Sequence, residues 1–429
     1  MNRNDLIDPH RIVLDSGLSL CILDSTASES VTVMMLVKVG SRFDPEKLSG
    51  TAHFLEHMFF KGTEALPTSS KLAMEIEMLG GVTNAFTSYE YTGYYIKVPK
   101  KSYKRAIQIL AQVMVTPVFK EEELEKEKGV ICEEIKMYND LPHEIIKDVF
   151  NTTLFPKHPL GRDIAGTVQT VGRISIDAIS NFRNNFYVAE NMHLVVSGDV
   201  DLDDVKEISN ESFKKLPRNS LHTREISRFE VKDISNKFVH LPKDSEQAHV
   251  VIGGFAPERN HEYEFPLKLG MYILTEGFGS LLFQKLREDM GIAYYVGGGI
   301  GTFNEVGKYV INAGLAVDKV ELGVRAILEG LTRISSGDFS DKDLIRAKNY
   351  YISSITEEVE TAEDKAGWYG MNLLFERKHI HPSELIDEIE GIERELLINA
   401  WKGIIKRDNV LVSVLSKSFN QDIIEEVNI

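Results

Sequence analysis

Hydrophobic and polar residues alternate at two places near the start of the sequence, and such alternation predicts β-strands. The first stretch covers residues 11–23 and the second, "VTVMMLVKV", residues 31–39. A Thr- and Tyr-rich stretch at 80–99, "GGVTNAFTSYEYTGYYIKVP", is broken by glycines and predicts two antiparallel strands. Amphipathic segments follow and predict helices over residues 101–115, 120–137, 144–153 and 174–186, after which "MHLVVSGDV" predicts another strand.

The second half of the chain repeats this order of elements. "HVVIGGFAPE" takes the place of the early strand, "EFPLKLGMYILTEGF" that of the first helix and "YYVGGGIGTFNEVGKYVINAGLA" that of the strand pair. Residues 174–186 match 392–404, and 191–197 match 409–415, so the shift is the same in both cases (392 − 174 = 409 − 191). The sequence therefore predicts an internal duplication.

This duplication sets the expected fold and boundaries. Runs of strands followed by runs of helices predict an α+β fold, with helices packed on a largely antiparallel sheet in each half. A polar, charge-mixed segment without clear periodicity joins the copies. We therefore expect a first half at 1–217, a linker at 218–237 and a second half at 238–429.

Charge and cysteine content narrow the classes of partner and compartment. The formal net charge is −16, from 49 basic and 65 acidic residues, so nucleic acid and anionic membranes would be repelled and basic ligands attracted. No apolar run approaches the ~18 residues of a membrane span. The opening residues leave no room for a signal or transit peptide, and two cysteines suit a reducing compartment. We expect an uncleaved cytoplasmic chain, the alternative being the matrix of a mitochondrion or reduced organelle.

The stretch "TAHFLEHMFFKGT" at 51–63 carries the clearest candidate chemistry. On a helix, His53 and His57 are four residues apart, so both imidazoles leave the same face and could bind one tetrahedral zinc ion. Glu56 lies beside that face, where it could contact water at the ion without ligating it. H-x-x-E-H also arises by chance, but two histidines and a glutamate amid apolar neighbours need partners, which a metal supplies.

A zinc hydrolase needs a third protein ligand and an open fourth position. The best candidate is Glu134, which lies downstream of His57 in the stretch "EKEKGVICEEIKMYND". Glu127 lies two helical turns earlier on the same face. Taken alone, this acidic helix would be interpreted as a solvated surface. The H-x-x-E-H motif upstream is the reason to interpret it as a source of the third zinc ligand.

Together, "GSRFDPEKLSGTAHFLEHMFFKGT" and "EKGVICEEIKMYND" closely resemble the pitrilysin-type inverzincin peptidases, in particular the branch of the mitochondrial processing peptidase β-subunit and its compact bacterial relatives. The resemblance covers nearly the whole chain. It implies a zinc endopeptidase with one ion per chain, bound by His53, His57 and Glu134. It also implies that Glu56 is the general base and Glu127 a supporting acid.

The resemblance extends to residues outside the metal motif. "GFGSLLFQKLREDMGIAYYVGGG" is similar to the family's glycine-rich loop and following helix, where an arginine and a tyrosine seven residues later contact substrate; Arg287 and Tyr294 have that spacing. "GGVTNAFTSYEYTGYY" is similar to the edge strand along which substrate lies, with Asn84 able to bond its backbone. Without the resemblance, all three would be ordinary surface or strand residues. The second copy has Ser354 where the first has Glu134, so we expect no second metal site there.

Substrate and assembly also follow from the resemblance. In the processing peptidases an acidic pair ten and fourteen residues after the third ligand recognises arginine, and Glu144 and Asp148 hold those positions. The resemblance thus implies extended, basic, presequence-like peptides, cleaved in a closed chamber. Single-chain relatives are twice as long, which implies a dimer: a homodimer, with a heterodimer as alternative. Two other functions stay open, a non-catalytic or partner-dependent subunit and a structural zinc site.

Overall fold

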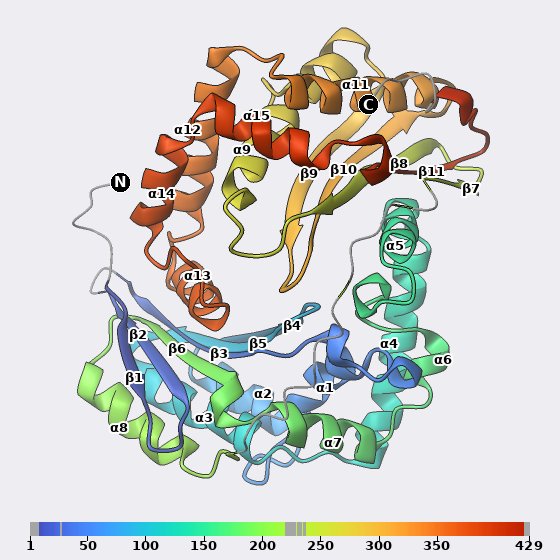
Figure 1. The fold of residues 1–429 in the computed structure, drawn as a ribbon. Coiled ribbons are helices and arrows are strands. Elements are labelled where there is room, and N and C mark those ends of the chain that lie inside the picture. The colour runs from blue at the N-terminus through green and yellow to red at the C-terminus, as the bar shows by residue number, and fades with distance from the viewer. Residues whose placement is uncertain (1–7, 26–27, 219–228, 230–233, 235–236, 424–429) are drawn as a thin grey trace. The chain divides into compact units, whose positions relative to one another are not determined.

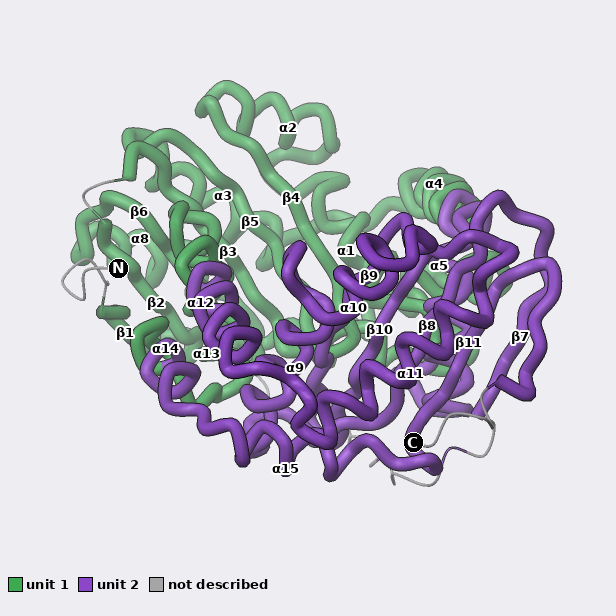
Figure 2. The backbone as a smooth tube through the Cα atoms, turned by 90° about the horizontal axis from the view of Figure 1, so that it is seen from above, with its two compact units in different colours: residues 1–136, 162–226, 356–384 green, residues 137–161, 227–355, 385–429 purple. Residues whose placement is uncertain are grey.

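The structure is a computed structural model that describes residues 8–25, 28–218, 229, 234 and 237–423 (Figure 1). Most of the predicted linker at 218–237 lies outside the described residues. The chain forms two compact units (Figure 2). Unit 1 comprises residues 1–136, 162–226 and 356–384, and unit 2 comprises 137–161, 227–355 and 385–429.

Unit 1 contains a six-stranded sheet with the order β1-β2-β6-β3-β5-β4. Only β2 and β6 are parallel, and the other neighbours are antiparallel. The expected antiparallel pair at 80–99 is formed by β4 and β5, and β4 is an edge strand. The strands are β1 His10–Val13, β2 Ser19–Asp24, β3 Ser30–Val37, β4 Val82–Thr87, β5 Thr92–Pro99 and β6 Met192–Gly198.

Helices cover both faces of this sheet. On one face, Val33 and Met35 of β3 join a large core with residues of α1, α3, α4, α7 and α8. On the other, Met34 and Leu36 pack under α13. Burial of both faces explains why "VTVMMLVKV" is almost continuously apolar. The helices are α1 Thr51–Phe59, α2 Ser69–Met78, α3 Tyr103–Val115, α4 Glu121–Asn139, α6 Val168–Val171, α7 Ile176–Phe186, α8 Leu202–Phe213 and α13 Ala362–Leu374.

Unit 2 repeats this plan with a five-stranded sheet in the order β7-β11-β8-β10-β9. Here too one neighbouring pair, β7 and β11, is parallel. The strands are β7 Phe238–Pro242, β8 Gln247–Ala256, β9 Ala293–Thr302, β10 Gly307–Ala316 and β11 Leu411–Ser416. The helices are α5 Pro142–Leu154, α9 Glu264–Thr275, α10 Leu281–Phe283, α11 Val320–Ser336, α12 Asp341–Glu357, α14 Pro382–Gly391 and α15 Arg394–Ile404.

Equivalent hydrogen bonds in the two copies reflect the duplication. Asn191 Nδ2 donates to the carbonyl of Phe186, which is the last residue of α7, at 2.9 Å. Asn409, its counterpart in the second copy, donates to the carbonyl of Ile404, the last residue of α15, at 2.8 Å. In both copies the same side chain therefore closes a helix end before the same strand. The expected α+β fold of two homologous halves is confirmed.

One helix of each copy packs on the sheet of the other copy. α5, which precedes β6 in the sequence, packs on β8 and β11 in unit 2, and α13 packs on β3 and β6 in unit 1. The compact units therefore do not follow the boundaries 1–217 and 238–429, which remain a prediction about the repeat. Within the described part of the chain, no helix is both long and apolar enough to span a bilayer.

Candidate metal centre

The site is built on α1, whose N-terminus is fixed by a buried carboxylate. Asp44 Oδ2 accepts from the backbone N–H of Gly50 at 2.7 Å, and its Oδ1 accepts from Ala52 at 3.0 Å. Gly50 has φ of 97°, and a β-carbon there would lie 2.4 Å from the carbonyl oxygen of Ala165, so only glycine fits. These contacts satisfy the N–H groups of the N-cap residue Gly50 and of Ala52 in the first turn, which have no partner within the helix.

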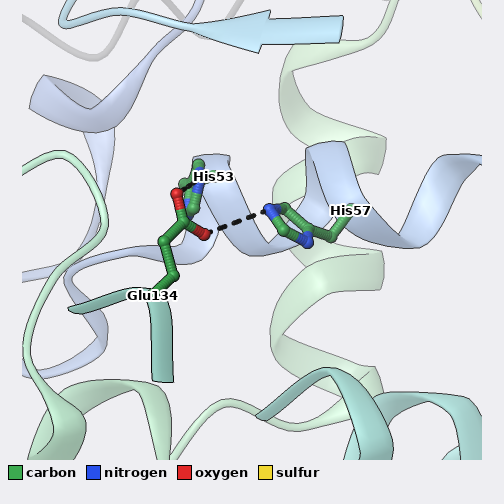
Figure 3. Close-up of side chains that lie close together, drawn as sticks. All are labelled: His53, His57 and Glu134. Atoms are coloured by element: carbon green, nitrogen blue, oxygen red, sulfur yellow. Dashed lines mark ion pairs between the residues drawn. The ribbon is translucent and has the colours of Figure 1, made fainter. Parts of the chain in front are cut away.

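The side chains of His53 and His57 on α1 and of Glu134 on α4 converge (Figure 3). His53 Nε2 lies 3.9 Å from Glu134 Oε1, and His57 Nε2 lies 3.7 Å from Glu134 Oε2. One ligand atom of each residue lies within 4.8 Å of the other two. Among the described residues, this is the one group of three or more His, Cys, Asp or Glu side chains spaced to hold an ion.

This donor set fits a zinc ion. Bonds of about 2.0–2.2 Å in a tetrahedron place ligand atoms roughly 3.3–3.6 Å apart, so small side-chain movements would close the observed distances. Two imidazoles and one carboxylate are a common zinc set that leaves a fourth position open. Burial and the neighbouring His57 lower the pKa of His53 to about 4, which keeps its imidazole in the neutral form that binds metals.

Glu127 supports His57 from behind. Its Oε2 accepts from His57 Nδ1 at 3.1 Å, and its Oε1 pairs with Lys61 Nζ at 2.6 Å. Burial alone would raise the pKa of Glu127, but the hydrogen bonds from His57 and Lys61 outweigh it and lower that pKa. A hydrogen bond on Nδ1 fixes the ring so that Nε2 faces Glu134, as is usual for metal-binding histidines. His53 Nδ1, by contrast, is buried without a hydrogen-bond partner among the described residues.

Glu56 lies on the same helix, and a residue of the sheet fixes its carboxylate by a hydrogen bond. Thr87 Oγ1, at the end of β4, donates to Glu56 Oε2 at 2.5 Å. Burial raises the pKa of Glu56, although the hydrogen bond from Thr87 opposes this. A carboxylate whose pKa is raised toward neutrality is suited to accept and return a proton.

The other expected site residues lie on β4 of unit 1 and in unit 2. Asn84 is exposed on the edge strand β4 of unit 1. Arg287 and Tyr294 lie in unit 2, where the Arg287 guanidinium donates to the Tyr294 backbone carbonyl. Tyr294 is 56% exposed.

Glu144 and Asp148 lie on α5 in unit 2, four residues apart as expected. Glu144 Oε1 accepts from Lys147 Nζ at 2.8 Å, and Asp148 lies near enough to Lys308 to act on it electrostatically. Each carboxylate of the expected arginine-binding pair therefore already has a lysine nearby.

The second copy has a different arrangement at the equivalent helix. α12 corresponds to α4, and matching their first residues, Asp341 and Glu121, aligns Ser354 with Glu134 (354 − 341 = 134 − 121). Ser354 Oγ and Tyr272 Oη are 2.9 Å apart, so a hydroxyl pair stands where the first copy has its carboxylate.

Three supporting residues were not expected from the sequence: Asp44, Lys61 and Thr87. Lys61 could have been found, because it follows His57 by four residues and Glu127 needs a cation. Asp44 and Thr87 form hydrogen bonds with α1 or its N-cap from a turn and from a strand, respectively. No pattern in the neighbouring sequence predicts these contacts.

Comparison with known proteins gives two matching family profiles. Residues 20–168 match the profile described as insulinase (peptidase family M16), and residues 173–351 match the M16 inactive domain. The uncharacterized zinc protease YmxG of Bacillus subtilis is 29% identical over 410 residues, 96% of this chain and 98% of that protein. An uncharacterized zinc protease of Rickettsia felis is 33% identical, over 90% of this chain and 92% of that protein.

Solved structures share the fold. A protease from Helicobacter pylori superposes with a TM-score of 0.88 at 22% identity, over 96% of this chain and all of that one. Pitrilysin superposes with a TM-score of 0.77 at 19% identity, and this chain covers 45% of its length. With a relative at 33% identity over nine-tenths of its length, the chain belongs to peptidase family M16, the insulinase and pitrilysin family, in its compact bacterial-type form.

Proposed function

We propose that this chain is a zinc-dependent endopeptidase, with one ion held per chain by His53, His57 and Glu134. The observation that carries the proposal is the convergence of these donors beside Glu56. The relatives named zinc proteases support it. A structural zinc site is less well supported, because three protein ligands leave a position open.

In the proposed hydrolysis, each residue of the site has a separate role. Bound zinc would act as a Lewis acid that polarises the scissile carbonyl and lowers the pKa of a water molecule to near neutral pH. Glu56 accepts a proton as water attacks the carbonyl carbon, and it returns that proton to the amine as the C–N bond breaks. Glu127 and Lys61 hold His57 in the orientation that the ligand set requires.

Substrate contacts belong to the same proposal. Asn84 would bond an extended peptide that adds to the edge strand β4. Arg287 and Tyr294 would donate to the oxyanion, from within a closed chamber. Glu144 and Asp148 would favour arginine near the cleavage site, in line with the net charge of −16, although Lys147 and Lys308 offset them.

We further propose that the protein is a cytoplasmic homodimer, with a heterodimer as the alternative. The chain covers 45% of pitrilysin, which supports an assembly of two such chains. A second candidate function is a non-catalytic or partner-dependent subunit of a complex like the processing peptidases. The name of the profile matched by residues 173–351, an inactive domain, favours it, whereas the intact donor set of the first copy opposes it.

The test is hydrolysis of an arginine-containing, presequence-like peptide, with products mapped by mass spectrometry and zinc content measured on the same samples. Glu56→Gln should keep its zinc and lose at least about a hundredfold in turnover, and chelation should abolish cleavage. Glu133→Gln, an exposed neighbour of Glu134, is the matched control and should change neither. Cleavage that survives in Glu56→Gln and in chelated protein would contradict the proposal.

The same product maps test the arginine preference. Replacing Glu144 and Asp148 together by lysine should move cleavage away from arginine, and unchanged cut positions would argue against that role. Retained zinc with no hydrolysis in any sample would favour the partner-dependent subunit.

A further inference from the structure

Unit 2 contains an open pocket of about 360 Å³ that the proposed mechanism does not use. Its floor is formed by the neighbouring strands β9 and β10, and residues of α5 and Val251 of β8 complete the lining. The lining residues are Lys147, Phe150, Asn151, Val251, Gly298, Gly299, Ile300, Gly301, Lys308, Val310 and Asn312.

The glycines of β9 create this space. Gly297, Gly299 and Gly301 pair with Asn312, Val310 and Lys308 of β10, so they share the pocket-facing side of the sheet. A β-carbon at Gly297 or Gly299 would meet no described atom within 4 Å. None of the three has a positive φ, so the backbone there does not require glycine. The missing side chains leave a trough along an edge strand.

Lys308 brings a positive charge into this trough. Its Nζ donates to Asn151 Oδ1 at 2.6 Å and has no ion-pair partner among the described residues. Asp148 acts on it electrostatically, and Lys147 is already paired with Glu144. None of the described residues that line the pocket is an acid. A desolvated ammonium that bonds only a neutral amide is unfavourable, and a carboxylate ligand would compensate it.

A second polar group lies further along the same strand. Asn312 Oδ1 is buried, and no described atom forms a hydrogen bond with it. Lys308 and Asn312 are four residues apart on one face of β10, about 13 Å at 3.3 Å per residue. The carboxylate and the N–H group that satisfy them must therefore come from different residues of one extended ligand. Val310 lies between them on β10 and Val251 pairs with Asn312 from β8, so the floor of the pocket suits an apolar side chain.

We propose that this pocket is a subsite for a peptide carboxylate, which binds Lys308 while a backbone N–H of the same peptide donates to Asn312. The proposal rests on the peptidase function and names a substrate feature for it. A C-terminal carboxylate fits best, because the chain that precedes it can run along the trough toward Asn312. An acidic side chain within the peptide offers the same chemistry.

Measuring peptide affinity tests the proposed subsite without requiring peptide hydrolysis. The full-length Glu56→Gln protein is titrated with a fluorescent ten-residue peptide that has no internal acid and ends either in a carboxylate or in an amide. A third, amidated peptide carries one internal glutamate. The carboxylate form should bind about tenfold more tightly than the amide. If the glutamate peptide binds as tightly as the carboxylate form, and both bind more tightly than the plain amide, the subsite accepts a carboxylate from either source.

Three variants locate the binding. Lys308→Met keeps the length of the side chain and removes its charge, and Gly299→Val fills the trough at a position with room for the new atoms. Both should bind the carboxylate and amide forms equally. Lys402→Met, on the exposed face of α15, should discriminate like the parent. Discrimination that persists in Lys308→Met, or that is absent in the parent, would overturn the proposal.

The binding experiment can fail or succeed independently of the test for peptidase activity. A chain that fails to hydrolyse peptides but discriminates through Lys308 would count against the peptidase activity alone. Thermal unfolding of each variant shows whether the folded protein was measured, and Gly299→Ala supplies a smaller filling of the trough should Gly299→Val unfold.

Discussion

Thr87 is the single side chain whose role is most sharply defined by one contact. Its hydroxyl donates to Glu56 at 2.5 Å and fixes the carboxylate that the proposed mechanism uses as a base. Thr87→Val keeps the shape and removes the donor, so kcat should fall about tenfold while KM and zinc content stay unchanged. Steady-state kinetics and metal analysis measure this.

Thr83 provides the control for Thr87. It lies four residues earlier on the same strand, and its hydroxyl donates to the Tyr95 carbonyl at 2.8 Å. Thr83→Val removes an equivalent donor that does not reach Glu56 and should leave kcat unchanged. Equal losses in both variants would mean that strand stability, not the orientation of Glu56, explains the effect.

Lys308 gives the proposed subsite a defined pH dependence. Burial lowers the pKa of Lys308 to about 8, and Asp148 partly opposes this. Because a carboxylate binds only the protonated amine, the preference for the carboxylate peptide should be full near pH 6.5 and decline as pH rises through about 8. A bound carboxylate raises that pKa and moves the decline upward.

Few charged groups surround Lys308, so the decline can be attributed to its own ammonium. α5 contributes Asp148 and the Lys147–Glu144 pair, and the lining residues of β8 and β9 carry no charge. Dissociation constants of the two peptides from about pH 6.5 to about pH 9.5 test the expectation. A carboxylate preference that is still undiminished at about pH 9.5 would contradict it.

Among the elements, α1 depends most on a contact from outside itself. Asp44→Ala removes the acceptor for two N–H groups at the start of α1, those of Gly50 and Ala52, so it should lower the free energy of unfolding by about 1–3 kcal/mol and weaken zinc binding. Asp201→Ala removes the N-terminal cap of α8 and should cost about 1 kcal/mol with no effect on zinc. Thermal unfolding and zinc titration separate the two, and parent-like zinc affinity in Asp44→Ala would contradict this role of Asp44.

Periodicity in the sequence predicted several of the elements, although the stretch at 11–23 forms two strands, β1 and β2, rather than one. The expected helix at 101–115 is α3 with one turn of 3-10 helix before it, and the one at 120–137 is α4. The convergence of His53, His57 and Glu134 also followed the spacing of the motifs. The contact from Thr87 did not, because its hydroxyl joins a strand to a helix 31 residues away and neither element's pattern depends on it.

The partner of each helix could not be predicted from periodicity. The pattern of α13 shows that one face is buried, but an apolar face fits any apolar sheet, and order in the sequence suggested the second copy. In the structure Gly370 lets α13 approach β3 and β6 so closely that a β-carbon there would lie 2.6 Å from Leu36. Only the three-dimensional fit of such small residues distinguishes one sheet from the other.

For the whole molecule, the exchanged helices predict how a cut chain behaves. A protease site inserted near residue 225 and then cleaved should leave two pieces that co-elute in size-exclusion chromatography. Each piece carries a helix whose apolar face covers the sheet of the other, Tyr369 and Leu374 among its buried residues. Pieces that separate without denaturant would contradict this. Residues 1–217 expressed alone should aggregate, since α13 no longer covers one face of their sheet.

The exchange also bears on ancestry. α5 and α13 are offset by the same amount at both ends (362 − 142 = 374 − 154), so they are the same helix in the two copies. If one copy once existed as a separate protein, two of its chains would have had to trade this helix to bury both sheets, as in a domain-swapped dimer. Fusion of two such genes would then have freed one copy to lose its metal ligands while its helix stayed indispensable to the other.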